Sequence, residues 1–164
     1  MRYPLIDLIK VRDFRVDARA KAMRAAETRL RAAQAQRDAR EGEWQDYKVW
    51  RKEEVERRYQ SILGQTMTQD ELDAFKAGLS ALADEELARE ERRIEADRAV
   101  EEARKEAQAA RNDWLLANRE REKIRYHRDD WQKNQTAEMN RQEDREQEEF
   151  KPLLFEAGEM ESFS

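Results

Sequence analysis

A sustained repeat of apolar side chains between residues 72 and 131 most constrains what this chain can fold into. Steps of alternately three and four residues from Leu72 to Trp131 meet an apolar residue at thirteen of eighteen positions. These are Leu72, Phe75, Leu79, Leu82, Ala96, Val100, Ala103, Ala107, Ala110, Trp114, Ala117, Ile124 and Trp131. A 3.5-residue period held over eight heptads is typical of a coiled coil, because only that period keeps one stripe against a partner helix. We therefore expect one long helix that packs on another.

The composition restricts the chain to a thin helical fold. Charged residues make up 43% of the sequence and hydrophobic residues 38%, whereas ordinary globular domains are about 25% charged. A thick core is therefore excluded, and the long heptad repeat argues against disorder. The chain has no cysteine and no run of about 18 apolar residues. The apolar run in its first ten residues is too short for the pattern of a secretory signal. We expect a cytoplasmic, soluble protein.

The partner helix and the turn are indicated by residues 1–68. Prolines occur only at positions 4 and 152, so the pattern predicts a first helix from about 5 to 62. Gly64 is suited to end that helix, and Thr68 with Glu71 forms a capping box that begins the next. The six-residue turn 63–68 makes the helices antiparallel neighbours. The predicted fold class is all-α, a long antiparallel two-helix coiled-coil hairpin.

The second helix is expected to run from about 69 to 149. Residues 1–150 would then form the hairpin, and residues 151–164, after Pro152, a separate acidic tail. Residues 1–40 carry a net charge of +6, and residues 138–164 carry −6.

A turn centred near Thr66 predicts which residues face each other, because their numbers should add up to about 132. Ile9 should lie near Ile124, and Val16 near Ala117. The polar interruptions of the two helices should also meet, which places Arg37 and Arg40 opposite Glu95 and Glu91. This coincidence favours a hairpin within one chain.

Catalytic, metal and nucleic-acid sites are not indicated. There is no glycine-rich phosphate loop and no cysteine nucleophile, and the single histidine, His127, is expected on the surface. The basic first helix is interleaved with acidic residues in a chain of net charge −5, which argues against nucleic-acid binding. We expect no enzyme activity, no metal and no cofactor.

Large apolar side chains gather near the predicted turn. They are Trp50, Tyr59, Leu63, Met67, Phe75 and Leu79. Two interpretations remain open for each residue: packing between the helices, or an exposed cluster that binds a partner. We favour the partner interpretation for Phe75 and Leu79, because two helices alone cannot enclose every large side chain there. Trp44 and Trp114 follow the apolar stripe and are expected in the core. Trp131 also follows the stripe but should face only the first residues of the first helix.

Three segments resemble a known family. They are Leu5–Arg19, Asp46–Glu54 (DYKVWRKEE) and Glu146–Phe150 (EQEEF). In length and order of elements the chain is similar to the YscO stalk proteins of bacterial type III secretion systems, relatives of the flagellar export protein FliJ. The resemblance implies a helical hairpin like the central stalk subunit of rotary ATP synthases.

The resemblance also implies partners. The end with both termini would enter the pore of the hexameric secretion ATPase, and the turn end would approach the export gate, a membrane protein. Secretion chaperones are further partners of the family. The family's partner cluster maps onto Tyr47, Trp50, Phe75 and Leu79. For the ATPase contact we expect the basic end of the first helix, through Arg12, Arg15 and Arg19.

The alternative is a generic structural coiled coil that spaces other proteins, for example as a homodimer. The short capped turn favours a self-contained monomer over a continuous two-chain coil.

Overall fold

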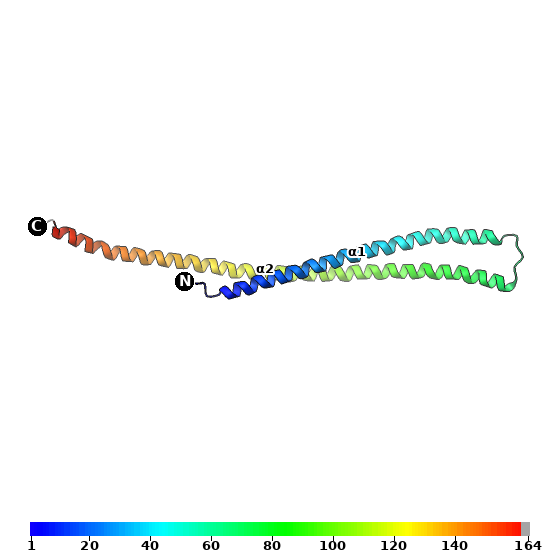
Figure 1. The fold of residues 1–164 in the computed structure, drawn as a ribbon, viewed down its shortest axis with the longest axis horizontal. Coiled ribbons are helices and arrows are strands. Elements are labelled where there is room, and N and C mark those ends of the chain that lie inside the picture. The colour runs from blue at the N-terminus through cyan, green and yellow to red at the C-terminus, as the bar shows by residue number, and fades with distance from the viewer. Residues whose placement is uncertain (162–164) are drawn as a thin grey trace. The chain divides into compact units, whose positions relative to one another are not determined.

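The chain folds into two long helices, α1 (Ile6–Ile62) and α2 (Gln69–Glu161), joined by a short turn (Figure 1). The computed structural model describes residues 1–161, with side chains from residue 1 to 151, and no strand occurs in that part. The helices pack against each other as a hairpin, which confirms the expected fold class. No helix in the described residues is long and apolar enough to cross a membrane.

The turn between the helices has the local chemistry that the sequence predicts. Gly64 adopts a left-handed conformation with φ of 76°, which a residue without a side chain tolerates best. The Glu71 amide donates to the Thr68 hydroxyl oxygen at 3.2 Å, and the Thr68 amide donates to the Glu71 carboxylate at 3.3 Å. This reciprocal pair confirms the capping box, which satisfies two amides at the start of α2.

The α2 helix does not end near residue 149, where Pro152 was expected to stop it. It continues through Pro152 to Glu161. A proline inside a helix costs about 3 kcal/mol and removes one backbone donor. Glutamate and glutamine before the proline, and leucine, glutamate and alanine after it, favour the helix, so the proline does not end it. The division into a hairpin and a separate tail stays a prediction.

The chain forms two compact units. Residues 19–113, here called the turn unit, form one, and residues 1–18 with 114–164, the terminal unit, form the other. The core of the turn unit is a line of buried side chains: Ala26, Tyr47, Leu82, Ala96, Val100, Ala103 and Ala107. Alanines in this line let the two helices approach closely.

The core of the terminal unit is a cluster at the beginning of α1. Tyr3, Ile9 and Ile124 are buried together, and Trp131 packs against them, which confirms that Ile9 lies near Ile124. Val16 and Ala117 are also buried. The Tyr3 and Trp131 rings meet edge to face at 5.4 Å.

One ion pair between the helices in each unit has the expected register. Arg12 pairs with Glu120 in the terminal unit, and Arg19 pairs with Asp113 in the turn unit at 3.9 Å. The residue numbers of both pairs add up to 132, the value that the turn predicts.

Arg37 and Arg40, expected opposite Glu95 and Glu91, make their ion pairs within α1 and not across the helices. Arg37 pairs with Asp38 at 3.1 Å, and Arg40 pairs with Glu43 at 3.0 Å, both within α1. Neighbouring carboxylates on the same helix are within reach of a flexible arginine. The ion pair that joins the helices here is formed by Arg93 and Glu41 instead, at 3.5 Å.

Candidate functional site

Tyr47 and Trp50 form a shallow groove on the surface of the turn unit. Their ring centroids are 5.4 Å apart, yet Tyr47 is only 8% exposed and Trp50 is 46% exposed. The groove has a volume of about 420 Å³ and is lined by Glu43, Asp46, Tyr47, Trp50 and Arg89. We call it the Trp50 groove. Its exposed indole gives a partner an apolar surface with charged groups around it.

Tyr47 is fixed in the core beneath this groove. Its hydroxyl donates to the Leu82 carbonyl oxygen at 3.1 Å, and the Arg89 guanidinium lies 4.6 Å from its ring centroid. Burial raises the pKa of the Tyr47 hydroxyl, and the nearby Glu85 carboxylate raises it further. A partner in this groove would therefore meet Trp50 first, with Tyr47 as its support.

Phe75 and Leu79 are both half-buried. The Phe75 ring meets Tyr59 edge to face at 5.4 Å, and Tyr59 is itself 49% exposed. The structure thus brings Tyr47 and Trp50 together, and places Phe75 against Tyr59. Tyr59 belonged to the apolar group near the turn, but the resemblance did not single it out.

Glu54 binds two arginines of the same helix. Its carboxylate accepts hydrogen bonds from Arg57 and Arg58, and these bonds lower the pKa of Glu54 to about 2. Arg58 lies over Gly78, where an added Cβ would be 3.1 Å from the Arg58 Nη1 atom. Because Gly78 has no side chain, the Arg58 guanidinium can lie against α2 at this position.

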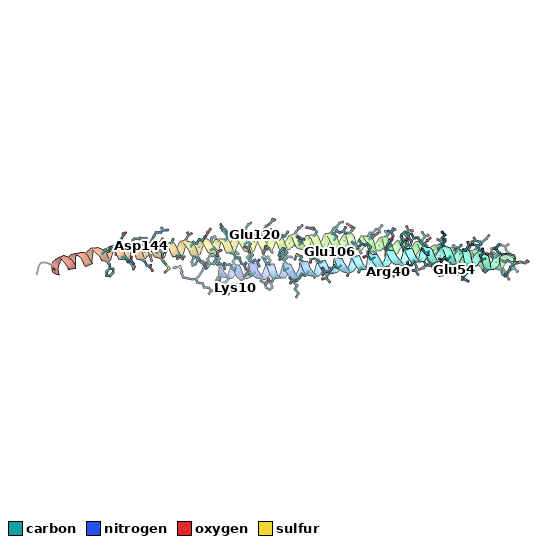
Figure 2. All side chains as sticks on the ribbon, turned by 90° about the horizontal axis from the view of Figure 1, so that it is seen from above. Lys10, Arg40, Glu54, Glu106, Glu120 and Asp144 are labelled. Atoms are coloured by element: carbon teal, nitrogen blue, oxygen red, sulfur yellow. The ribbon has the colours of Figure 1, made fainter. Side chains whose placement is uncertain are left out.

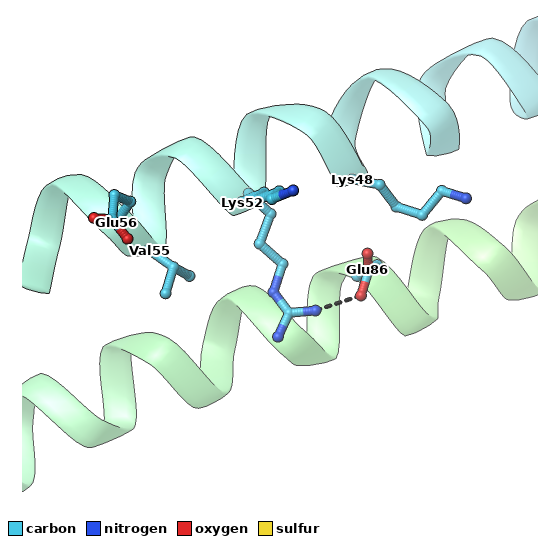
Figure 3. Close-up of a pocket in the computed structure, with 6 residues that line it drawn as sticks. Lys48, Lys52, Val55, Glu56 and Glu86 are labelled. Atoms are coloured by element: carbon cyan, nitrogen blue, oxygen red, sulfur yellow. Dashed lines mark hydrogen bonds and ion pairs between the residues drawn. The ribbon is translucent and has the colours of Figure 1, made fainter.

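A second groove in the turn unit was missed by the sequence analysis (Figure 3). It has a volume of about 390 Å³ and is lined by Lys48, Arg51, Lys52, Val55, Glu56 and Glu86. Arg51 reaches from α1 to the Glu86 carboxylate. The available signal was the spacing of the three cations, which places them on one turn of α1.

The three arginines expected to contact the ATPase have different surroundings. Arg12 donates a hydrogen bond to Glu120, and this bond, followed by one from Lys123, lowers the pKa of Glu120. Arg15 is exposed and makes no ion pair with residues 1–151. Arg12 and Arg15 belong to the terminal unit, and Arg19, paired with Asp113, belongs to the turn unit.

His127 lies on the surface, as expected. Its Nδ1 atom shares a 2.6 Å hydrogen bond with the Tyr3 hydroxyl, so the segment before α1 is tied to α2. Within the described residues, no three histidine or carboxylate side chains come together as a metal site.

The α2 helix extends beyond α1 in the terminal unit. Trp131 packs against Tyr3, and α2 continues for thirty further residues to Glu161. Between residues 132 and 151, only Gln135 and Ala137 are half-buried and all other side chains are exposed. Asp144 marks this extension in Figure 2. Met139 and Phe150 are exposed large apolar side chains among these polar residues.

These features define a class of protein, a two-helix coiled-coil protein whose exposed aromatic and charged surfaces suit protein partners. The family model of type III secretion protein YscO matches residues 5–152. The chain therefore belongs to the YscO family of type III secretion proteins, which confirms the resemblance.

Solved structures agree with this assignment. A protein described as a YscO homolog, CT670 from Chlamydia trachomatis, is similar with a TM-score of 0.77 and 28% sequence identity, over 98% of both chains. Type III secretion protein YscO from Vibrio parahaemolyticus is similar with a TM-score of 0.79 and 28% identity, over 88% of this chain and 91% of that one. No curated protein sequence matches the chain significantly.

Proposed function

We propose that this protein is a non-enzymatic stalk that couples a type III secretion ATPase to the export gate, with secretion chaperones as further partners. The observation that carries the proposal is the α2 extension. Within the described residues it leaves thirty residues of helix, mainly polar as far as residue 149, without α1 beside them, and it starts next to the basic beginning of α1. A helix of this kind suits insertion into an oligomeric partner.

The proposed ATPase contact consists of Arg12, Arg15, Arg19 and the α2 extension. Because Arg12 and Arg19 already pair with carboxylates, Arg15 is the cation most available to a partner. The proposed gate contact consists of Tyr47, Trp50, Phe75 and Leu79. Trp50 offers the largest exposed aromatic surface in that set, and exposed aromatic residues are frequent energetic centres of interfaces.

The ATPase contact can be tested with purified proteins. We expect the protein alone to hydrolyse no nucleotide and to change the turnover of its cognate secretion ATPase. Charge reversal at Arg12, Arg15 and Arg19 together should weaken this effect, and Arg15→Glu alone should account for much of the loss. The matched control is Arg111→Glu, an exposed arginine without an ion pair among the described residues. A salt-dependent affinity that all these variants leave unaltered would refute the site.

The gate contact can be tested in secreting cells. The double variant Phe75→Ala with Leu79→Ala should abolish secretion while the protein remains folded. Because both side chains are half-buried, some loss of stability is expected with it. A strongly destabilised double variant, or a folded one that still supports secretion, would contradict the partner role.

The alternative function, a structural spacer, predicts a different mass. A two-chain coil would be a dimer at micromolar concentration, whereas the capped turn favours a monomer of 19.7 kDa. Light scattering separates the two, because it does not depend on molecular shape. A spacer would also leave the turnover of the ATPase unchanged.

A further inference from the structure

The face of α1 that points away from α2 in the terminal unit carries exposed apolar side chains. Phe14 is 76% exposed and Val11 is 53% exposed, although both lie in the middle of a regular helix. Ile9 and Val16, on the opposite side of the same turns, are buried against α2. We call the surface formed by Lys10, Val11, Phe14, Arg15 and Ala18 the Phe14 face.

The spacing of the Phe14 face is that of a coiled coil. Phe14 follows Val11 by three residues, and Ala18 follows Phe14 by four, which is the a-to-d-to-a step of a heptad. The seven-residue step from Val11 through Ala18 continues along α1 as Ala25, Ala32 and Ala39, all of them exposed. Val11 and Phe14 provide the large side chains of this stripe. Lys21 and Thr28 occupy the positions seven and fourteen residues after Phe14. The second stripe is therefore apolar from Val11 to Ala18 and is interrupted beyond it, and α2 does not cover it.

The charges beside this stripe are mainly positive. Lys10 and Arg15 flank Phe14, and Arg24 and Arg31 flank the alanines that follow. All four are exposed and make no ion pair within residues 1–151, whereas Arg12, Arg19 and Arg29 are paired with carboxylates of α2. Asp17 and Asp38 are the carboxylates on the same flanks. Flanking charges select the partner of a coiled coil, so a partner here would carry carboxylates beside its apolar stripe.

We infer that the Phe14 face is a docking surface for an acidic amphipathic α-helix of another protein of the secretion apparatus. Such a helix would place apolar residues against Val11, Phe14 and Ala18, and carboxylates beside Lys10 and Arg15. This site is separate from the Trp50 groove and from the α2 extension. It shares Arg15 with the proposed ATPase contact, but its centre is Phe14 and not an arginine.

The test uses the full chain in cells that produce the rest of the secretion apparatus. Phe14 is replaced by the photoreactive analogue p-benzoylphenylalanine, and crosslinked products are mapped by mass spectrometry. The matched control places the same analogue at Tyr126, which is 73% exposed in the same unit but lies on α2. We expect a crosslink at position 14, and not at 126, to a helix with carboxylates beside its apolar stripe.

A second part of the experiment tests the charges with the double variant Lys10→Glu and Arg15→Glu. This pair should lower the crosslink yield severalfold, lysines in place of the mapped carboxylates should restore it, and Lys10→Arg with Arg15→Lys should leave it unchanged. Circular dichroism checks that each variant is folded.

The inference is overturned if position 14 gives no crosslink or if position 126 gives the same product. It is also overturned if the crosslink yield does not change with the charges at positions 10 and 15. Capture of a second copy of this chain, of RNA or of lipid would also overturn it. An acidic helix from a protein other than the ATPase supports the docking surface. A crosslink to the ATPase itself would make the Phe14 face part of the proposed ATPase contact and would overturn it as a separate site.

Discussion

Substitutions of Tyr47 and Trp50 test which aromatic side chains of the turn unit stabilise the fold and which bind a partner. They lie three residues apart on α1 with their rings in contact, but only Trp50 is substantially exposed. We therefore compare Tyr47→Ala with Trp50→Ala, and add Tyr47→Phe to isolate the hydroxyl group. The three variants should separate clearly in the free energy of unfolding.

The magnitudes follow from the contacts. Truncation of a buried aromatic side chain to alanine costs about 3–5 kcal/mol, and Tyr47 has the burial to reach that range. Tyr47→Phe removes only the hydrogen bond to Leu82, which contributes about 0.5–1.5 kcal/mol. Because nearly half of the Trp50 surface remains in water, Trp50→Ala should cost about half as much as a fully buried truncation, roughly 1.5–2.5 kcal/mol.

Urea unfolding followed by far-ultraviolet circular dichroism measures these differences. Secretion is then assayed at a temperature at which each variant is folded. We expect Trp50→Ala to impair secretion while folded, and Tyr47→Phe to leave it nearly normal. The reasoning is refuted if Trp50→Ala destabilises the protein as much as Tyr47→Ala, or if secretion survives the loss of Trp50.

Three further predictions concern single contacts. The folded protein holds the pKa of Glu54 near 2, below the ordinary carboxyl value, so its contribution to stability is complete at neutral pH and is lost as the pH falls from about 4.5 towards 2. The melting temperature of wild type should therefore fall towards that of Glu54→Gln over this range. The ion pair of Arg12 and Glu120 is partly exposed, so a double-mutant cycle should give a coupling of at most about 1 kcal/mol. Thr68→Ala removes a helix cap and should cost about 0.5–2 kcal/mol in urea unfolding, with faster amide exchange in the first turn of α2.

The first and the third of these predictions have a matched control variant. Glu53→Gln, an exposed neighbour, should show no comparable pH dependence, and parallel melting curves for Glu54→Gln and wild type would contradict the first prediction. A coupling well above 1 kcal/mol would show that the pair is shielded from solvent more than its exposure indicates. Thr66→Ala, in the same turn but outside the capping box, should be nearly neutral, and equal losses at 66 and 68 would contradict the third.

The heptad of α2 and the chemistry of the turn were readable from the sequence alone. A period of 3.5 residues specifies which stripe of a helix is buried, and a capping box specifies where a helix begins, because both depend on residues close together in the chain. The turn at Gly64 then fixed the register, so the neighbourhood of Ile9 and Ile124 followed without any tertiary information.

The contacts at the interrupted part of the stripe depended on the tertiary structure. Trp50 and Tyr47 are one helical turn apart, and only the packed helices decide which of two adjacent rings is covered. The ion partners of Arg37 and Arg40 were equally open, because exposed ion pairs differ by about 1 kcal/mol or less and several carboxylates are within reach. The spacing of apolar residues in the sequence does not resolve energy differences as small as these.

The sequence analysis did not recognise the Phe14 face of α1, for a related reason. Its stripe from Val11 through Phe14 has the same period as the stripe that packs on α2, and a linear pattern does not state which of two stripes the partner covers. The structure assigns Ile9 and Val16 to the interface and leaves Phe14 in solvent. Local spacing therefore determined the helices, the turn and their register, whereas burial, which sums contacts from both helices, decided which side chains remain free for partners.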